Sequence, residues 1–220
     1  MKSALFCTDE YKNIERKIKD FLNAQVEFLS GSTIKSTRAA GDAMQDILSK
    51  HFQSIVGETH CLNYSPEFAR RAMADLAFED RDKFYYVVDV KTHRTSTKFS
   101  MPNLTSVKRL ARFYEDDKNY FVILYIGYDV EGLRVVVTDV KFVPIEFLSW
   151  ECLTLGALGW GQIQIANANR IIVNPQNTRK GWMLELCDTL FEFYPREIAK
   201  INDRIDYFKK VRAHWEKESD

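Results

Sequence analysis

The chain has 220 residues, 45% of them hydrophobic and 28% charged, a composition typical of a globular protein with one sizeable core. Its 31 Lys and Arg residues balance its 31 Asp and Glu residues, which excludes a protein that coats nucleic acid with a uniformly basic surface. We find no apolar run that could span a bilayer and no signal peptide, so we expect a cytoplasmic protein without a membrane partner. The four cysteines are far apart, which favours free thiols over a disulfide framework or a zinc site.

Although the net charge is zero, the charged residues are unevenly distributed along the chain. Six cations and no carboxylate lie between Lys91 and Tyr114, and no acidic residue lies between Cys152 and Leu184. A partner that is negatively charged would therefore meet two favourable stretches of the chain.

Hydrophobic periodicity predicts a mixed α/β protein with a central mixed β-sheet flanked by helices, folded as a single domain over residues 1–220. Two amphipathic helices come first, then two hairpins separated by a helix, then a region rich in Gly and Asn, then two further helices. Pro195 suits the first turn of the last helix. The predicted helices cover 8–30, 38–55, 103–114, 181–193 and 196–217, and the predicted strands cover 72–78, 83–91, 120–128 and 132–143.

The last predicted helix carries an apolar stripe formed by Ile198, Ile201, Ile205, Phe208 and Trp215. Residues three and four apart share one face of a helix. We interpret the stripe as core or as a dimer contact, and not as a cofactor site.

Five Asp/Glu-x-Lys patterns occur, where about one is expected by chance. Only Asp89/Lys91 and Asp139/Lys141 end apolar strands, where alternation puts both side chains on one face. Asp75 lies across the predicted "EDRD" turn from Asp89, within one or two positions of register. The strand that pairs with Asp139 contains no carboxylate in its apolar run, so the sequence predicts convergence at the first pair alone.

Two carboxylates that converge at strand ends suit Mg²⁺, which binds one or two carboxylates and keeps several waters. An adjacent lysine such as Lys91 can hold or deprotonate an attacking water and contact a phosphate. The alternative interpretation is a buried ion pair at the end of a strand.

Four stretches together resemble the PD-(D/E)xK nucleases, and within them the blunt-cutting branch of type II restriction endonucleases, the HincII and EcoRV group. Together they extend over residues 39–182, most of the chain, in the family's order. The stretches are "AAGDAMQDIL", "ADLAFEDRDKFYYVVDVKTHR", "SMPNL" and "QIQIANANRIIVNPQNTRKGW".

The resemblance implies a restriction-endonuclease-like fold with a catalytic and DNA-recognition core over 72–182 and C-terminal helices over 182–217. It implies Asp75 and Asp89 as ligands of Mg²⁺, for which Mn²⁺ can substitute, and Lys91 as the catalytic lysine. Asp42 matches a helical acid that is usually Glu in the family; a favourable charge near a helix start is the alternative.

The resemblance also implies a bacterial homodimer that cuts both strands of a short palindromic duplex DNA site and leaves 5′-phosphates, with the 8–30 helix in the dimer contact. A companion DNA methyltransferase is expected in the same restriction-modification system, though not as a physical partner.

Amide and basic side chains can read bases or hold phosphates, and they cluster in the acid-free stretches. Hydrated loops are the alternative for these amide-rich segments, and for Arg179 a structural cap. The candidate DNA-binding residues are Thr92, His93, Arg94, Lys98, Ser100, Asn103, Lys108, Arg109, Gln162, Gln164, Asn167, Asn169 and Arg179.

Three other functions stay open at this point. One is a catalytically inactive, sequence-specific DNA-binding relative, although the complete Asp75, Asp89 and Lys91 set argues against it. Another is a DNA repair or junction nuclease of the same superfamily. The third is a metal-free interaction protein that uses its amphipathic helices, which leaves the four matched stretches unexplained.

Overall fold

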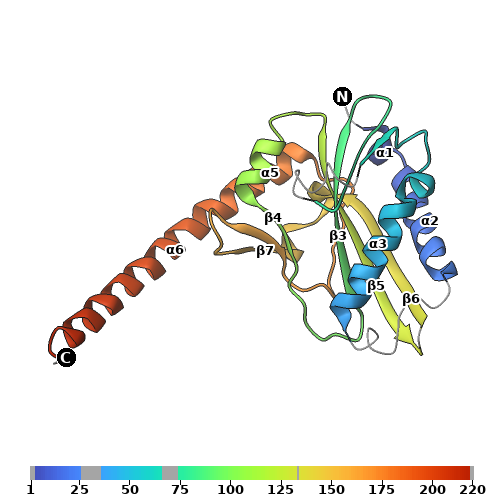
Figure 1. Ribbon diagram of the computed structural model, residues 1–220. Helices are drawn as coiled ribbons and strands as arrows, with labels where there is room; N and C mark the ends of the chain where they lie inside the picture. The colour runs from blue at the N-terminus through green and yellow to red at the C-terminus, as the bar shows by residue number, and fades with distance from the viewer. Residues whose placement is uncertain (1–2, 26–35, 66–73, 133, 219–220) are drawn as a thin grey trace. The chain divides into compact units, whose positions relative to one another are not determined.

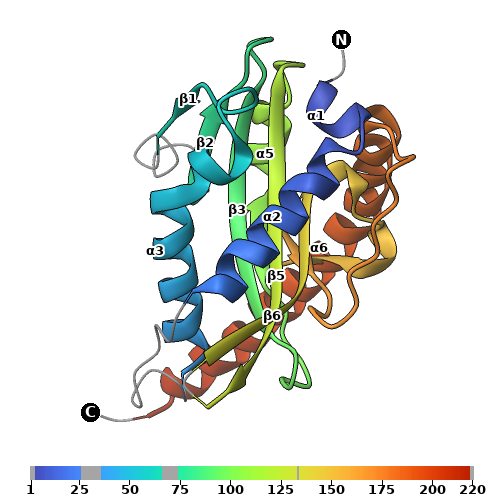
Figure 2. The ribbon, with the colours of Figure 1, turned by 90° about the vertical axis from the view of Figure 1, so that its right-hand side faces the viewer.

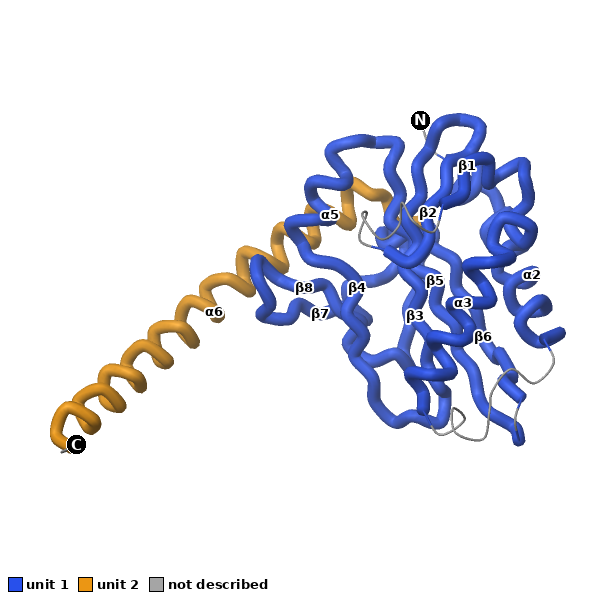
Figure 3. The backbone as a smooth tube through the Cα atoms, in the orientation of Figure 1, with its two compact units in different colours: residues 1–175 blue, residues 176–220 orange. Residues whose placement is uncertain are grey.

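The computed structural model describes residues 3–25, 36–65, 74–132 and 134–218. The chain divides into two compact units, residues 1–175 and 176–220 (Figure 3). Unit 1 contains two β-sheets and the helices that pack on them, and unit 2 is built on one long helix. The predicted class, mixed α/β with a central mixed sheet flanked by helices, is confirmed.

The central sheet of unit 1 has five strands in the order β1-β2-β3-β5-β6 (Figure 1). β3 and β5 run parallel, and the other neighbours are antiparallel. β2, β3 and β5 each have a neighbour on both sides, and most of their residues are buried. The strands are β1 (Asn63–Tyr64), β2 (Leu76–Glu79), β3 (Tyr85–Arg94), β5 (Asn119–Glu131) and β6 (Arg134–Pro144).

Helices α1 (Ala4–Cys7), α2 (Glu10–Ala24) and α3 (Thr37–Val56) precede the sheet in the chain. α2 packs on β6 and α3 on β3, and both cross the same face of the sheet (Figure 2). α2 is amphipathic, as predicted, and buries Tyr11, Ile14, Ile18 and Leu22, while the end of the predicted 8–30 helix lies outside the described residues.

The predicted hairpin over the "EDRD" turn is confirmed as β2 and β3, and its turn is organised by the buried carboxylate of Asp80. One carboxylate oxygen accepts the backbone N–H of Phe84 at 3.0 Å and that of Asp82 at 2.9 Å. The other oxygen accepts the hydroxyl of Tyr86 at 2.6 Å. Asp80 therefore fixes where β2 ends and β3 begins.

A second, three-stranded antiparallel sheet has the order β4-β8-β7. It is built from β4 (Asn103–Ser106), β7 (Leu153–Gly156) and β8 (Gln162–Ile165). The helix predicted at 103–114 is shorter: residues 103–106 are extended, and α5 (Val107–Phe113) begins where the Ser106 hydroxyl accepts the N–H of Arg109. Pairing with β8 competes with helix formation at this point and prevails.

Unit 2 contains a single helix, α6 (Arg179–Trp215), in place of the two predicted helices. The prediction that Pro195 starts a new helix is wrong, since the proline lies inside α6. A proline removes one backbone donor and kinks a helix without always ending it. No helix among the described residues is both long and apolar enough to cross a membrane.

We predict that Asp80→Ala lowers the free energy of unfolding by about 2 to 3 kcal/mol, because it leaves buried donors without an acceptor. Chemical denaturation measures this change. Asp82→Ala, at an exposed position of the same turn, is the control and should stay within about 0.5 kcal/mol of wild type. Equal effects of the two substitutions would show that the Asp80 network does not hold the hairpin.

Candidate active site

The β2–β3 register brings Asp75 and Asp89 together as predicted. Leu76 pairs with Val88, so Asp75 lies level with Asp89 one position further along. The Asp75 backbone N–H donates to Val88 O at 3.0 Å, and the Asp75 carboxylate accepts the N–H of Val90 at 2.7 Å. The Asp75 carboxylate thus takes the place of a backbone carbonyl as the acceptor for Val90 N–H, just before β2 begins.

Asp89 is a buried carboxylate, with 5% of the residue exposed. Burial raises the pKa of Asp89 to about 7, the neighbouring Lys91 ammonium lowers it in part, and the negative charge of Asp75 raises it. A carboxyl whose charge is disfavoured by its surroundings is often found where a protein binds a cation or a substrate.

Lys91 lies two residues after Asp89 on the same face of β3. Its Nζ donates to Asp89 Oδ1 at 2.7 Å, and its side chain keeps 22% of its surface exposed. The second oxygen of Asp89, Oδ2, is buried and has no hydrogen-bond partner among the described residues. The pair therefore presents one positive group that solvent can reach and one unsatisfied acceptor.

The residues present fit a Mg²⁺ ion. An unsatisfied buried carboxylate oxygen is costly unless something pairs with it, and a hard cation would satisfy Asp89 Oδ2. Asp75 uses one of its oxygens on Val90 and has a second to offer. Within the described ranges, no group of three or more His, Cys, Asp and Glu side chains is positioned to hold a metal, so the site offers two carboxylates.

Asp139 and Lys141 form a second pair on the same sheet, with Lys141 Nζ 2.8 Å from Asp139 Oδ1. Lys91 and Lys141 both lie beside Tyr125, one on each side of β5. Because β3 and β6 run in opposite directions, Asp89 lies level with Ile123 and Asp139 with Gly127. The two aspartates are roughly 13 Å apart along the strands and cannot share an ion.

The expectation that no carboxylate approaches Asp139 is wrong. Glu15 of α2 accepts the N–H of Phe142 at 2.8 Å and lies near Asp139 and Lys141. Burial raises the pKa of Glu15, Lys141 lowers it and Asp139 raises it. The acid comes from a helix rather than from the partner strand, so strand pairing could not indicate it. Asp139 is 48% exposed, in contrast to Asp89.

Asp42 lies on α3, where an exposed ion pair joins it to Arg38 at 3.9 Å. Its neighbour Gly41 packs on β3 so closely that a Cβ there would lie 2.5 Å from the Thr92 hydroxyl. Thr92 thus faces α3, whereas Asp89 and Lys91 lie on the opposite face by strand alternation. A direct part for Asp42 in the site stays a prediction.

The two amide-rich clusters, which are 61 residues apart at Asn103 and Gln164, form one surface. β4 pairs with β8, Asn103 lies opposite Gln164, and the Gln164 amide donates to Asn103 Oδ1. Ala168 N–H donates to Ser100 O at 2.8 Å, which continues the contact beyond the strands. Gln162 and Gln164 alternate with buried isoleucines and share one face of β8.

His93 and Asn169 are bonded to each other. His93 is 4% exposed, and its Nε2 lies 2.9 Å from Asn169 Oδ1. The Asn169 amide also donates to the backbone oxygens of Thr97 and Lys98, at 2.8 and 3.2 Å. These bonds fasten the loop after β3 next to β8. His93 is therefore a buried residue of β3 and not part of a solvated loop.

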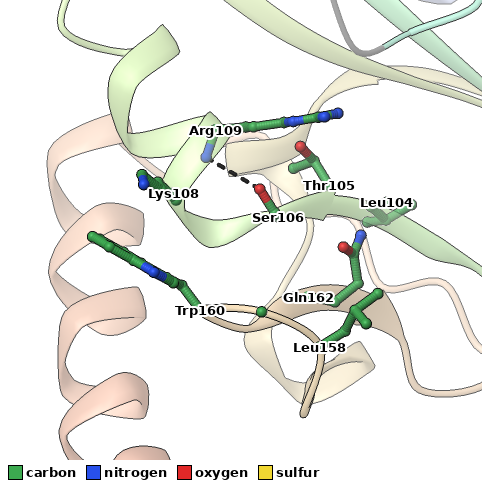
Figure 4. Close-up of a pocket in the computed structure, with 9 residues that line it drawn as sticks. Leu104, Thr105, Ser106, Lys108, Arg109, Leu158, Trp160 and Gln162 are labelled. Atoms are coloured by element: carbon green, nitrogen blue, oxygen red, sulfur yellow. Dashed lines mark hydrogen bonds between the residues drawn. The ribbon is translucent and has the colours of Figure 1, made fainter.

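A pocket between β4, α5 and the β7–β8 turn contains Lys108, Arg109 and Gln162 (Figure 4). Trp160, which the sequence reasoning missed, also lines it with 61% of its surface exposed. Lys108 Nζ lies 4.1 Å from the centre of the Trp160 ring. The sequence does indicate this residue: Trp160 lies between two glycines in an acid-free stretch, and a glycine-rich turn exposes the side chain that it carries.

The remaining candidates lie in varied surroundings. Arg94 approaches Asp129 at 3.6 Å, and Asn167 accepts the N–H of Asn169 at 3.0 Å. Lys98 is exposed after β3. Arg179 is the first residue of α6, after the Thr178 cap that accepts the N–H of Gly181. Contact of these residues with DNA stays a prediction.

Comparison with protein-family models and with curated protein sequences found no match to this chain.

We predict that Asp89→Asn changes how stability depends on pH. The pKa of about 7 in the folded protein lies above the ordinary carboxyl value of 3.8, so the wild type loses stability as pH rises between the two values. The substituted protein lacks this loss. Its free energy of unfolding should therefore rise relative to wild type from about pH 4 to pH 7 in EDTA. Parallel pH profiles of the two proteins would contradict this, and Asp139→Asn is the exposed control.

Proposed function

We propose that the chain is a Mg²⁺-dependent type II restriction endonuclease, which hydrolyses phosphodiester bonds in both strands of a short palindromic duplex DNA site. The observation that carries the proposal is the group formed by Asp75, Asp89 and Lys91. Two carboxylates converge there, one with an unsatisfied buried oxygen, and a solvent-accessible ammonium lies 2.7 Å from Asp89. The matched stretches support the restriction class rather than a repair nuclease.

Asp75 and Asp89 would hold the cation on the face of the sheet opposite α3. The bound ion would supply positive charge to the phosphate and lower the pKa of a water. Binding would also replace the proton that Asp89 retains near neutral pH. Burial of Asp89 and the backbone bond of Asp75 fix both carboxylates before any ligand arrives, so little reorganisation is required.

Lys91 would orient the attacking water and contact a non-bridging phosphate oxygen. The water oxygen forms a new bond to phosphorus while the bond from phosphorus to the 3′ oxygen breaks. The water gives up a proton and the 3′ oxygen gains one, which leaves a 5′-phosphate and a 3′-hydroxyl. Because the amine must move from Asp89 to phosphate, its partial exposure suits this role.

The joined surface of β4 and β8 supports DNA recognition. It presents Asn103, Gln162 and Gln164 beside the Lys108 and Arg109 cations. Amides pair with adenine and cations with guanine or phosphate. The proposed setting is the cytoplasm of a bacterium, where a companion methyltransferase would protect the host's own sites.

We predict that Lys91→Ala reduces cleavage of duplex DNA by several orders of magnitude and leaves the fold intact. Activity should require Mg²⁺ or Mn²⁺ and stop in EDTA. Gel analysis of plasmid digestion and circular dichroism measure these outcomes. Lys141→Ala is the matched control, because it removes a paired lysine on the other side of Tyr125, and it should remain near wild type.

Three results would contradict the proposal: cutting that persists in EDTA, equal losses from the two lysine substitutions, or tight sequence-specific binding without cleavage. The last result would identify the chain as an inactive DNA-binding relative.

We also predict where the cut falls. A twofold dimer applies one site to each strand of a palindrome, and the distance between its two sites determines the stagger. The resemblance to blunt-cutting enzymes implies cleavage at the centre of a site of roughly six base pairs. Run-off sequencing of both strands of a digested plasmid measures this. Staggered ends would contradict the blunt arrangement, and an asymmetric site would contradict the twofold dimer.

A further inference from the structure

The long helix of unit 2 carries an apolar heptad repeat that is exposed to solvent. Counted with Leu184 as position a, apolar residues and Cys187 occupy the a and d positions as far as Trp215, apart from Arg212. The apolar members are 37 to 71% exposed, so of the two interpretations, core or dimer contact, the core is wrong. They are Leu184, Phe191, Tyr194, Ile198, Ile201, Ile205, Phe208 and Trp215.

A strict alternation of three- and four-residue spacings over this length is typical of a coiled coil and not of a helix that lies on a globular core. Exposed apolar surface of this extent marks an interaction site. The remaining question is which partner covers it, and the charges beside the stripe decide between the possibilities.

We propose that α6 pairs with α6 of a second copy of this chain as an antiparallel coiled coil. In the favoured register, a residue of one copy lies level with the residue of the second copy for which the two residue numbers add up to about 399. Ile198 then packs on Ile201 of the second copy, and Phe191 on Phe208 of the second copy. Apolar residues face each other in every layer except the one that pairs Arg212 with Cys187, and the contact is symmetric about a twofold axis.

The flanking charges favour this register. Asp188 lies near Lys209 of the second copy, and Glu197 near Arg204 of the second copy, so opposite charges meet on both sides of the stripe. A shift of one heptad in one direction places Glu197 level with Glu197 of the second copy. A shift in the other direction places Arg204 level with Arg204 of the second copy. Like charges oppose both alternatives.

A parallel pairing is disfavoured by the same residues. It would bring Arg212 against Arg212 of the second copy in the buried seam, and Arg204 against Lys209 of the second copy beside it. In the antiparallel pairing Arg212 lies level with Cys187, a neutral residue. The mixed signs along α6 also argue against DNA or an anionic membrane as the partner of this face, since both prefer a basic one.

The inference goes beyond the proposed nuclease activity and is tested without DNA or metal. Sedimentation of the full chain should show a dimer. Ile198→Glu with Ile201→Glu should raise the dimer dissociation constant at least about 100-fold, because charges would enter the apolar seam. Ala199→Glu with Ala213→Glu adds the same charge outside the seam and should leave the dimer intact. A wild-type monomer, or a dimer that survives the isoleucine substitutions, would overturn the proposal.

Crosslinking tests the direction of pairing, independently of whether the isoleucine variant folds. In a Cys7→Ser background, mild oxidation of Arg212→Cys should give a covalent dimer that joins position 212 to Cys187 of the second copy, identified by mass spectrometry. Adding Cys187→Ser should abolish it. A Cys187–Cys187 crosslink in the chain without the Arg212 substitution would indicate parallel pairing and overturn the antiparallel arrangement.

Discussion

The register of β2 on β3 is the constraint on which the candidate site depends. Asp75 and Asp89 are 14 positions apart in the chain, and only the pairing of Leu76 with Val88 sets them level. The Asp80 turn fixes that register at one end, and the bond from Val90 N–H to the Asp75 carboxylate fixes it at the other. A shift of this register by one residue would turn Asp89 and Lys91 to the face that packs on α3 and would separate them from Asp75.

Burial of Asp89 connects the fold to the proposed chemistry. β3 lies between β2 and β5, so a charged side chain there is shielded from water and its pKa rises to about 7. Natural chains rarely keep such a group unless it serves a function. The second pair, Asp139 and Lys141, shows the contrast: it lies on the edge strand, and about half of the Asp139 side chain is exposed to solvent. The two pairs look alike in the sequence and differ in their surroundings.

Much of this could be predicted from the sequence, because strand alternation and the turn at Asp80 are local features. They correctly indicated the hairpin, the shared face of Asp89 and Lys91, and the approach of Asp75. Non-local packing could not be predicted in the same way. Glu15 reaches Asp139 from a helix more than a hundred residues earlier, and Asn103 pairs with β8 instead of starting a helix. Pro195 stays within α6, since a proline alone does not decide where a helix ends.

If the β2–β3 hairpin holds a divalent cation between Asp75 and Asp89, Mn²⁺ should bind there, and electron paramagnetic resonance measures this binding. Wild type and Asp139→Asn should bind Mn²⁺ equally, whereas Asp75→Asn and Asp89→Asn should each weaken binding at least about tenfold. Unchanged binding in both of these variants, or a loss confined to Glu15→Gln and Asp139→Asn, would contradict the account and move the cation to β6.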